Sequence, residues 1–200
     1  NADGAVRYAE RAYSLLSLQK PAPRIAAVMI GNLAYSLSLA GRLGEALPKF
    51  AESIAMCKAI GAEESPTAVS VWNNWGLAAL ASGNPLLALD FFNRVRDISA
   101  RRSPSGSPPI YALVNLARVL NLLERPTEAV REAERAIELA RANGGNASAE
   151  IPALGSLIDA LRRQGQLEQA RAALEAIDGR LTEGIPFDSP AMLNLLRLRV

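Results

Sequence analysis

Histidine is absent from this 200-residue chain, and cysteine occurs only once. Without histidine the chain cannot use His-based acid–base catalysis, and most kinds of zinc site are excluded. The single cysteine, Cys57, allows no disulfide framework within the chain, and a small buried apolar residue is its simplest interpretation. We therefore expect no metal site, no cofactor and no enzymatic activity.

Aromatic residues are scarce, at 5% of the chain, although half of all residues are hydrophobic. The high hydrophobic fraction excludes a disordered chain, and the length is sufficient to bury a sizeable core. That core must consist mainly of alanine, leucine, isoleucine and valine. Such a composition suits closely packed helices better than a sheet.

The chain also lacks an excess of charge of one sign, because 22 basic residues are balanced by 20 acidic ones. A phosphate backbone or an anionic membrane would select a basic surplus, so neither a nucleic acid nor a membrane is an expected partner. No apolar run reaches 18 residues and no signal peptide is recognisable, which favours a cytoplasmic protein. Nineteen of the basic residues are arginines, a bias typical of GC-rich bacterial genomes.

What the chain does contain is an internal repeat of 41 or 42 residues. Four tight turns mark it, at Ala40-Gly41, Ser82-Gly83, Leu123-Glu124 and Gln164-Gly165. Each turn is followed five positions later by a small residue, namely Ala46, Ala88, Ala129 and Ala170. Apolar residues recur at helical spacing on both sides of each turn, which predicts an antiparallel pair of helices per repeat. Because one pair cannot bury its apolar faces alone, neighbouring pairs are expected to stack into one array.

The turns and the proline and glycine clusters predict the boundaries of about ten helices in a single array over residues 1–200. The helices are expected at residues 5–19, 25–40, 44–60, 67–82, 85–100, 108–123, 126–143, 149–164, 167–182 and 189–200. Complete repeats are expected at residues 24–60, 66–100, 107–143 and 148–182. Residues 5–19 then form a second helix without its first, and residues 189–200 a first helix without its second. These open ends predict a segment of a longer array.

The residues Ser65-Pro66-Thr67-Ala68-Val69, followed by Trp72-Asn73-Asn74-Trp75-Gly76, resemble the tetratricopeptide repeat family. They are similar to the kinesin-light-chain form, in which a proline opens the first helix and Asn-Asn-Leu-Ala follows about seven residues later. The 41–42-residue spacing also looks like this long-helix variety, which occurs in bacterial signalling proteins as well. The resemblance implies an all-α, right-handed superhelical solenoid of antiparallel helix pairs that binds polypeptide. Two positions depart from the pattern: Ser156 replaces an asparagine, and Glu124 replaces the turn glycine.

Asparagine recurs at the repeat spacing, as Asn32, Asn74 and Asn115. An asparagine side chain both donates and accepts hydrogen bonds, so a ladder of such residues can pair with the peptide units of an extended ligand. In similar repeats this position faces the concave groove and binds the ligand backbone. The alternative interpretation is that these side chains cap helices or bridge neighbouring repeats.

The resemblance also implies which neighbouring positions face the groove. The predicted peptide-binding residues are Asn32, Tyr35, Asn73, Asn74, Leu77, Asn115, Arg118, Asn121, Asp159 and Arg162, with Gly31, Val114 and Gly155 beside them. Arg118, Arg162 and Arg163 could hold a carboxylate by bidentate hydrogen bonds. The alternative is ordinary solvated charge, with Asp159 neutralising one arginine. Trp72 and Trp75 are both expected to pack in the core.

Two functions follow from these patterns. The first is a protein–protein interaction scaffold that binds an extended peptide or a partner protein in its concave groove. The second is a regulatory or sensor arm of a larger bacterial signalling protein, a kinase or a transcription activator, which binds an effector or its own neighbouring domain. RNA binding by helical repeats is disfavoured by the near-neutral charge. The sequence indicates neither the partner nor an oligomeric state.

Overall fold

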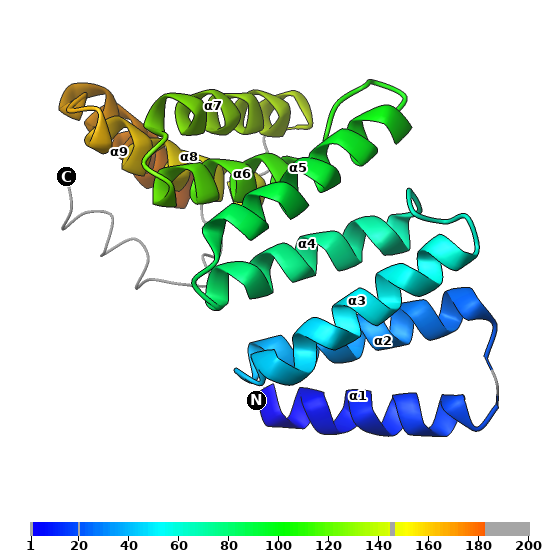
Figure 1. Ribbon diagram of the computed structural model, residues 1–200. Helices are drawn as coiled ribbons and strands as arrows, with labels where there is room; N and C mark the ends of the chain where they lie inside the picture. The colour runs from blue at the N-terminus through cyan, green and yellow to red at the C-terminus, as the bar shows by residue number, and fades with distance from the viewer. Residues whose placement is uncertain (1, 20, 145–146, 183–200) are drawn as a thin grey trace. The chain divides into compact units, whose positions relative to one another are not determined.

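The computed structural model describes residues 2–19, 21–144 and 147–182, and within these ranges every regular element is an α-helix (Figure 1). The chain divides between Ser107 and Pro108 into two compact units, with α1–α5 in unit 1 and α6–α9 in unit 2. The helices of unit 1 are α1 (Ala2–Ser17), α2 (Pro23–Leu39), α3 (Leu43–Ala59), α4 (Pro66–Ala81) and α5 (Pro85–Arg102). Those of unit 2 are α6 (Ile110–Leu122), α7 (Pro126–Ala142), α8 (Ala147–Arg163) and α9 (Leu167–Thr182).

The all-α fold class and the first nine expected helices are confirmed, with each boundary within three residues of its expected place. The expected helix at residues 189–200 lies outside the described residues. The arrangement of all the repeats in one continuous array stays a prediction, because each unit is described by itself.

Proline and short polar residues determine where the helices begin. Pro23, Pro66, Pro85 and Pro126 are the first residues of their helices, where the missing N–H has no intrahelical partner to lose. Ser65 and Asn84 cap α4 and α5, because the Ser65 Oγ accepts from the Ala68 N–H and the Asn84 Oδ1 from the Leu87 N–H, both at 3.2 Å.

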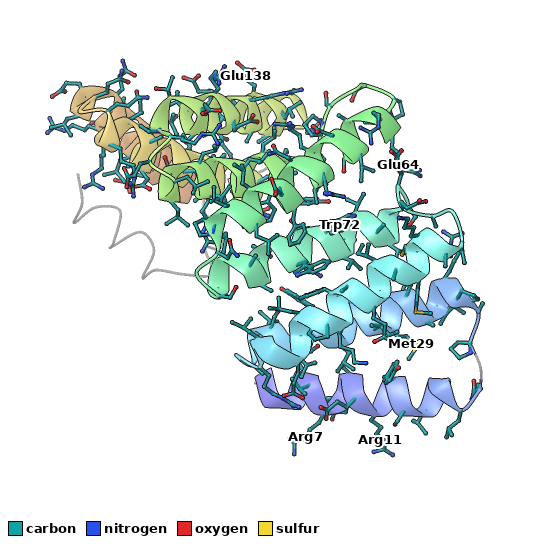
Figure 2. The ribbon with its side chains drawn as sticks, viewed as in Figure 1. Arg7, Arg11, Met29, Glu64, Trp72 and Glu138 are labelled. Atoms are coloured by element: carbon teal, nitrogen blue, oxygen red, sulfur yellow. The ribbon has the colours of Figure 1, made fainter. Side chains whose placement is uncertain are left out.

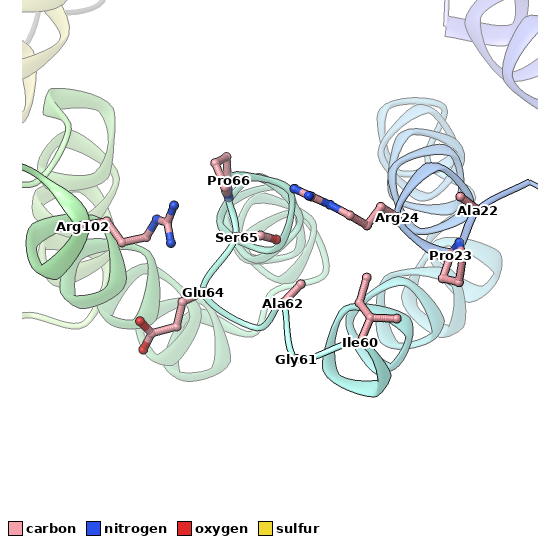
Figure 3. A pocket seen from close by; sticks show the side chains of 10 residues that line it. All are labelled: Ala22, Pro23, Arg24, Ile60, Gly61, Ala62, Glu64, Ser65, Pro66 and Arg102. Atoms are coloured by element: carbon pink, nitrogen blue, oxygen red, sulfur yellow. The ribbon is translucent and has the colours of Figure 1, made fainter.

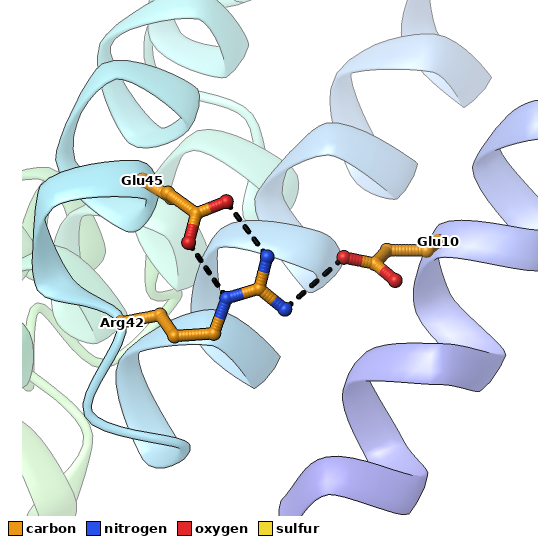
Figure 4. A network of polar contacts seen from close by, with 3 residues as sticks. All are labelled: Glu10, Arg42 and Glu45. Atoms are coloured by element: carbon orange, nitrogen blue, oxygen red, sulfur yellow. Dashed lines mark hydrogen bonds and ion pairs between the residues drawn. The ribbon is translucent and has the colours of Figure 1, made fainter.

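Two arginines take the capping position where no such residue is present. Arg42 precedes α3 and donates from Nε and from a terminal nitrogen to the two carboxylate oxygens of Glu45, at 2.7 Å each (Figure 4). It also reaches Glu10 of α1 at 3.2 Å. Arg125 precedes α7 and bonds both oxygens of Glu128 in the same way. These hydrogen bonds lower the pKa of Glu45 and that of Glu128.

The four turns inside the repeats share one backbone conformation. Gly41, Gly83 and Gly165 have φ of +76°, +74° and +73°. Glu124 occupies the corresponding position with φ of +56°, and it is the only residue other than glycine with a positive φ in the described ranges. The turn geometry is therefore retained where the glycine is lost, at the cost of a strained left-handed residue.

Small residues bring the helices of unit 1 close together. The buried Ser53 of α3 donates to the carbonyl of Ala27 of α2 at 2.7 Å. A Cβ placed on Gly76 would lie 2.5 Å from Phe92 Cε1, so α4 can approach α5 this closely only because residue 76 is glycine. Cys57 is buried as expected, and burial raises the pKa of its thiol.

An aromatic cluster joins α3, α4 and α5 of unit 1. The rings of Trp72 and Trp75 stack with centroids 5.4 Å apart, and Phe50 and Phe91 pack against them. The expectation that both tryptophans lie in the core holds only in part, because each packs against buried residues but is itself half-buried. The cluster brings together four of the ten aromatic residues of the chain, including both tryptophans.

The core of unit 2 is aliphatic, with Leu113, Ile151, Ile158 and Ile177 as large buried members. It also contains Glu150, which is 1% exposed and accepts a hydrogen bond from Arg141 Nε at 2.7 Å. In the part of the chain that the structure describes, no helix is both long and apolar enough to cross a membrane.

Candidate functional site

Five of the ten predicted peptide-binding residues line one hollow in unit 2, which we call the inner hollow of unit 2. It has a volume of about 550 Å³ and lies between α6 and α8. The five residues are Asn115, Arg118, Asn121, Asp159 and Arg162, and the neighbouring Val114 and Gly155 also line it as expected. The repeat spacing therefore locates residues that the fold brings together from two helices.

Two of the three predicted arginines are available in this hollow. Arg118 is exposed and Arg162 half-buried, and neither makes an ion pair or hydrogen bond with the described residues. Arg163 differs, because it donates to Glu124 at 2.6 Å and to Asp159 at 3.3 Å. These hydrogen bonds raise the pKa of Arg163, and they hold its guanidinium in a structural contact.

Asn121 combines a structural contact with an unusual acceptor. It is 2% exposed, and its Nδ2 donates to the Ser156 carbonyl at 2.9 Å, which joins α6 to α8. Its Oδ1 is buried without a hydrogen-bond partner. The side chain thus bridges two repeats, and its donor is not available to a ligand.

Asn32 and Asn74 line a smaller hollow of about 270 Å³ between α2 and α4, which we call the inner hollow of unit 1. Asn32 is exposed and Asn74 half-buried, and the Asn74 Oδ1 accepts from Asn73 Nδ2 at 3.3 Å. Gly31, Thr67 and Ser70 are among the other lining residues, and none of the lining residues is charged. The two inner hollows therefore differ in charge, with the arginines confined to that of unit 2.

Three predicted residues lie outside both inner hollows. Tyr35 packs against the core of unit 1, Leu77 is half-buried, and Asn73 reaches the hollow of unit 1 only through its bond to Asn74. Sequence reasoning also missed Thr67 and Ser70. These lie seven and four residues before Asn74, so they share its helix face, and this spacing could have identified them.

Another hollow of unit 1 lies at the loop between repeats, away from the predicted residues. Its volume is about 610 Å³, and Figure 3 shows Arg24 and Arg102 directed toward Ser65 and Pro66 from opposite sides. The lining residue Glu64 is paired with Arg101 at 2.6 Å. Within the described ranges, no group of three or more Cys, Asp or Glu side chains could hold a metal ion.

Comparisons with known proteins agree with this architecture. The sequence profile described as "Tetratricopeptide repeat" matches residues 24–101 and 110–177, well over half of the chain. No curated protein sequence matches the chain.

Solved structures share the fold at low sequence identity. The crystal structure of BtubC (BKLC) from P. vanneervenii has a TM-score of 0.80 at 17% identity, and covers 94% of this chain and 78% of its own. The nearly identical TPR-like repeats of a Podosopora anserina putative kinesin light chain have a TM-score of 0.73 at 18% identity, covering 93% of this chain and 90% of their own. A single-substitution form of those repeats has the same TM-score and identity, covering 89% and 85%.

Proposed function

The chain belongs to the tetratricopeptide repeat family, whose repeats generally serve as protein–protein interaction scaffolds, and we propose that its inner hollows bind an extended peptide segment of a partner protein. The observation that carries the proposal is the convergence of Asn115, Arg118 and Arg162 from two helices on one hollow. A volume of about 550 Å³ is within the range that ligand pockets use.

Each residue has a separate part in this binding. The amide of Asn115 pairs with a peptide unit of the ligand irrespective of its side chains. Arg118 and Arg162 provide two guanidinium groups that no carboxylate of the described residues neutralises. They favour a ligand that carries a carboxylate at this position, because planar guanidinium groups bind carboxylates in bidentate geometry. Asp159 stays with Arg163, which keeps its negative charge from competing.

The inner hollow of unit 1 by itself offers a neutral contact of the same kind. Asn32 and Asn74 lie on neighbouring first helices of successive repeats, and both line the inner hollow of unit 1. Amide and hydroxyl groups in this hollow can bond a peptide backbone without selecting a charge. Family membership supports a polypeptide ligand, and the two hollows supply the residues that select it.

The test begins with peptides selected from a displayed random library on the intact chain. The affinity of the best peptide is then measured by fluorescence anisotropy for wild type and variants. Asn115→Ala and Arg118→Ala are each expected to weaken binding about tenfold, which is the loss of one charge-assisted or well-aligned hydrogen-bonding group.

Arg131→Ala is the matched control, since Arg131 is exposed on α7 and lines neither inner hollow. It is expected to leave the affinity unchanged. If Asn115→Ala and Arg118→Ala bound the peptide as tightly as Arg131→Ala does, the selected peptides would bind elsewhere. That result would reject the proposal.

A further inference from the structure

An apolar groove lies on the opposite side of α8 from the inner hollow of unit 2. Its floor is formed by Leu154, Leu157 and Leu161, whereas the inner hollow uses Gly155, Asp159 and other residues of the same helix. At 100° per residue these two sets point in nearly opposite directions. We call this surface the outer groove; it lies between α7 and α9 and has a volume of about 540 Å³.

The α9 wall of the outer groove is formed mainly by small residues. Ala172, Ala173 and Ala176 line it together with Gln169, and Ala172 is exposed. The repeat spacing of 82 residues places Ala173 at the position of Phe91 in unit 1, and Ala176 at that of Arg94.

Unit 1 has larger side chains at the corresponding positions, and the hollow of about 570 Å³ that it has there is lined by Trp72 and Arg94. Trp72 and Trp75 are found where unit 2 has Leu154 and Leu157, and Phe91 packs against both rings. The Arg94 guanidinium lies 5.0 Å from the centre of the Trp72 ring. Unit 2 therefore has aliphatic and alanine side chains where unit 1 has three aromatic rings and an arginine.

The charge along the α7 wall indicates what the outer groove accepts. Glu134 and Glu138 are exposed, one turn apart, and neither has an ion pair or hydrogen bond with the described residues. Glu138 projects from α7 in Figure 2. Arg141, the only basic residue of the lining, donates to the buried Glu150. Because Glu150 balances Arg141, the wall presents two uncompensated negative charges beside an apolar floor.

We propose that the outer groove binds an amphipathic helix of a partner protein, with aliphatic side chains on the leucine floor and lysine or arginine residues beside Glu134 and Glu138. A helix lying between α7 and α9 would cover the floor and bring its flank within reach of both carboxylates. This surface is separate from the proposed peptide site, so one chain could hold two partners at once.

The probes are two synthetic helical peptides of about four turns, each with one leucine face. One peptide carries lysine along the flank and the other glutamate at the same positions. Binding to the intact chain is measured by fluorescence anisotropy at low salt. The lysine peptide is expected to bind about tenfold more tightly than the glutamate peptide, as two exposed charge pairs would give.

Variants of the exposed wall locate the binding without disturbing the core. The double variant Glu134→Gln and Glu138→Gln is expected to abolish the preference for lysine, and Ala172→Arg to prevent binding of both peptides. Glu175→Gln on α9 is the matched control, because Glu175 is exposed but does not line the outer groove. Arg118→Ala in the inner hollow is also expected to leave this binding unchanged, which separates this proposal from the proposed function.

Several results would overturn the inference. Equal affinity for the two peptides, a preference that persists in the glutamine double variant, or no binding of either peptide would each do so. The sequence of residues 183–200 includes Arg197 and Arg199. If Arg197→Glu with Arg199→Glu strengthened peptide binding, the occupant that the peptides displace would be this segment of the chain itself. If sedimentation showed a dimer that Ala172→Arg dissociates, the occupant would be a second copy of the chain.

Discussion

Backbone conformation requires glycine at some positions of this chain, whereas at others nothing in the structure requires it. Gly83 has a φ of +74°, and no atom lies within 4 Å of the place where a Cβ would be, so its requirement is conformational alone. Gly44 lies inside α3, also with nothing near its Cβ position, and has an ordinary helical backbone. Glu124 shows that the left-handed position can be occupied by another residue when the surrounding helices hold it there.

Substitution of these two glycines by alanine is expected to have opposite effects on stability. Gly83→Ala should lower the free energy of unfolding by about 1 kcal/mol, because an L-residue is strained at this φ. Gly44→Ala should raise it by about 0.5 kcal/mol, because alanine is the better helix former. Urea denaturation followed by circular dichroism checks both values, and changes of the same sign would contradict the argument.

The arginine caps at the starts of α3 and α7 predict a dependence of stability on pH. The pKa of Glu45 and that of Glu128 are lowered in the folded chain by hydrogen bonds from Arg42 and Arg125. Their contribution to stability is therefore present above the ordinary carboxyl pKa of 4.5 and is lost as the pH falls through the lowered values. Both side chains are more than a third exposed to solvent, so the effect is expected to be small.

The double variant Glu45→Gln and Glu128→Gln tests this contribution. It should be slightly less stable than wild type at pH 7, and the difference should shrink as the pH falls below about 4.5. Melting temperatures of both proteins between pH 3 and pH 7, at low ionic strength, give the comparison. A difference that stays constant over this range would reject the assignment.

At the scale of helices, α4 and α5 pack together at short range because a glycine of α4 faces a phenylalanine of α5. Gly76 faces the fully buried Phe92, and three atoms of the ring lie within 3 Å of the place where a Cβ would be. An alanine here must displace the ring or separate the helices. The same relation recurs between Gly31 of α2 and Val71 of α4, where the Cβ position is 2.8 Å from Val71 Cγ2.

Gly76→Ala is accordingly expected to destabilise the chain by about 2 kcal/mol, a typical cost of overpacking a core. Thermal denaturation checks this value against Gly44→Ala, which adds the same methyl group to a helix without crowding. The double variant Gly76→Ala with Phe92→Leu should lose less stability than the sum of the two single variants, because the smaller side chain makes room for the methyl group. Simple additivity would show that the two residues do not compete for space.

At the scale of the whole molecule, the chain consists of two units with different cores. Unit 1 contains the aromatic cluster and both tryptophans, whereas the core of unit 2 is aliphatic. In repeat proteins each helix pair is stabilised by its own contacts and those with its neighbours, so a unit with its own core can retain its fold when separated.

A fragment of residues 1–107 is therefore expected to fold alone and to keep the tryptophan emission of the intact chain. Emission shifted to that of solvent-exposed tryptophan would mean that unit 1 depends on residues 108–200. Circular dichroism of the complementary fragment of residues 108–200, which lacks tryptophan, measures the second unit by itself.

The tetratricopeptide identity, the helices and much of the inner hollows could be predicted because all three depend on periodic contacts. Residues that recur every 41 or 42 positions occupy equivalent places, so Asn32 and Asn74 were predicted to lie together, and the structure brings both to one hollow. The assignment of all three arginines to a ligand was not reliable, because Arg163 bonds Glu124 from another repeat. The repeat pattern does not predict the Arg163–Glu124 pair, because the pair depends on two particular side chains.

The presence of the outer groove and the burial of Glu150 likewise depend on the tertiary structure and could not be predicted from the sequence. The sequence by itself determined the secondary structure, the family and the helix faces, since these follow from local spacing and turn residues. Whether a given face was filled, paired or left open depended on side-chain volumes and charges brought together from different helices. Alanine at 173 and 176 is ordinary in a helix, and only its packing opposite Leu157 of α8 makes a groove.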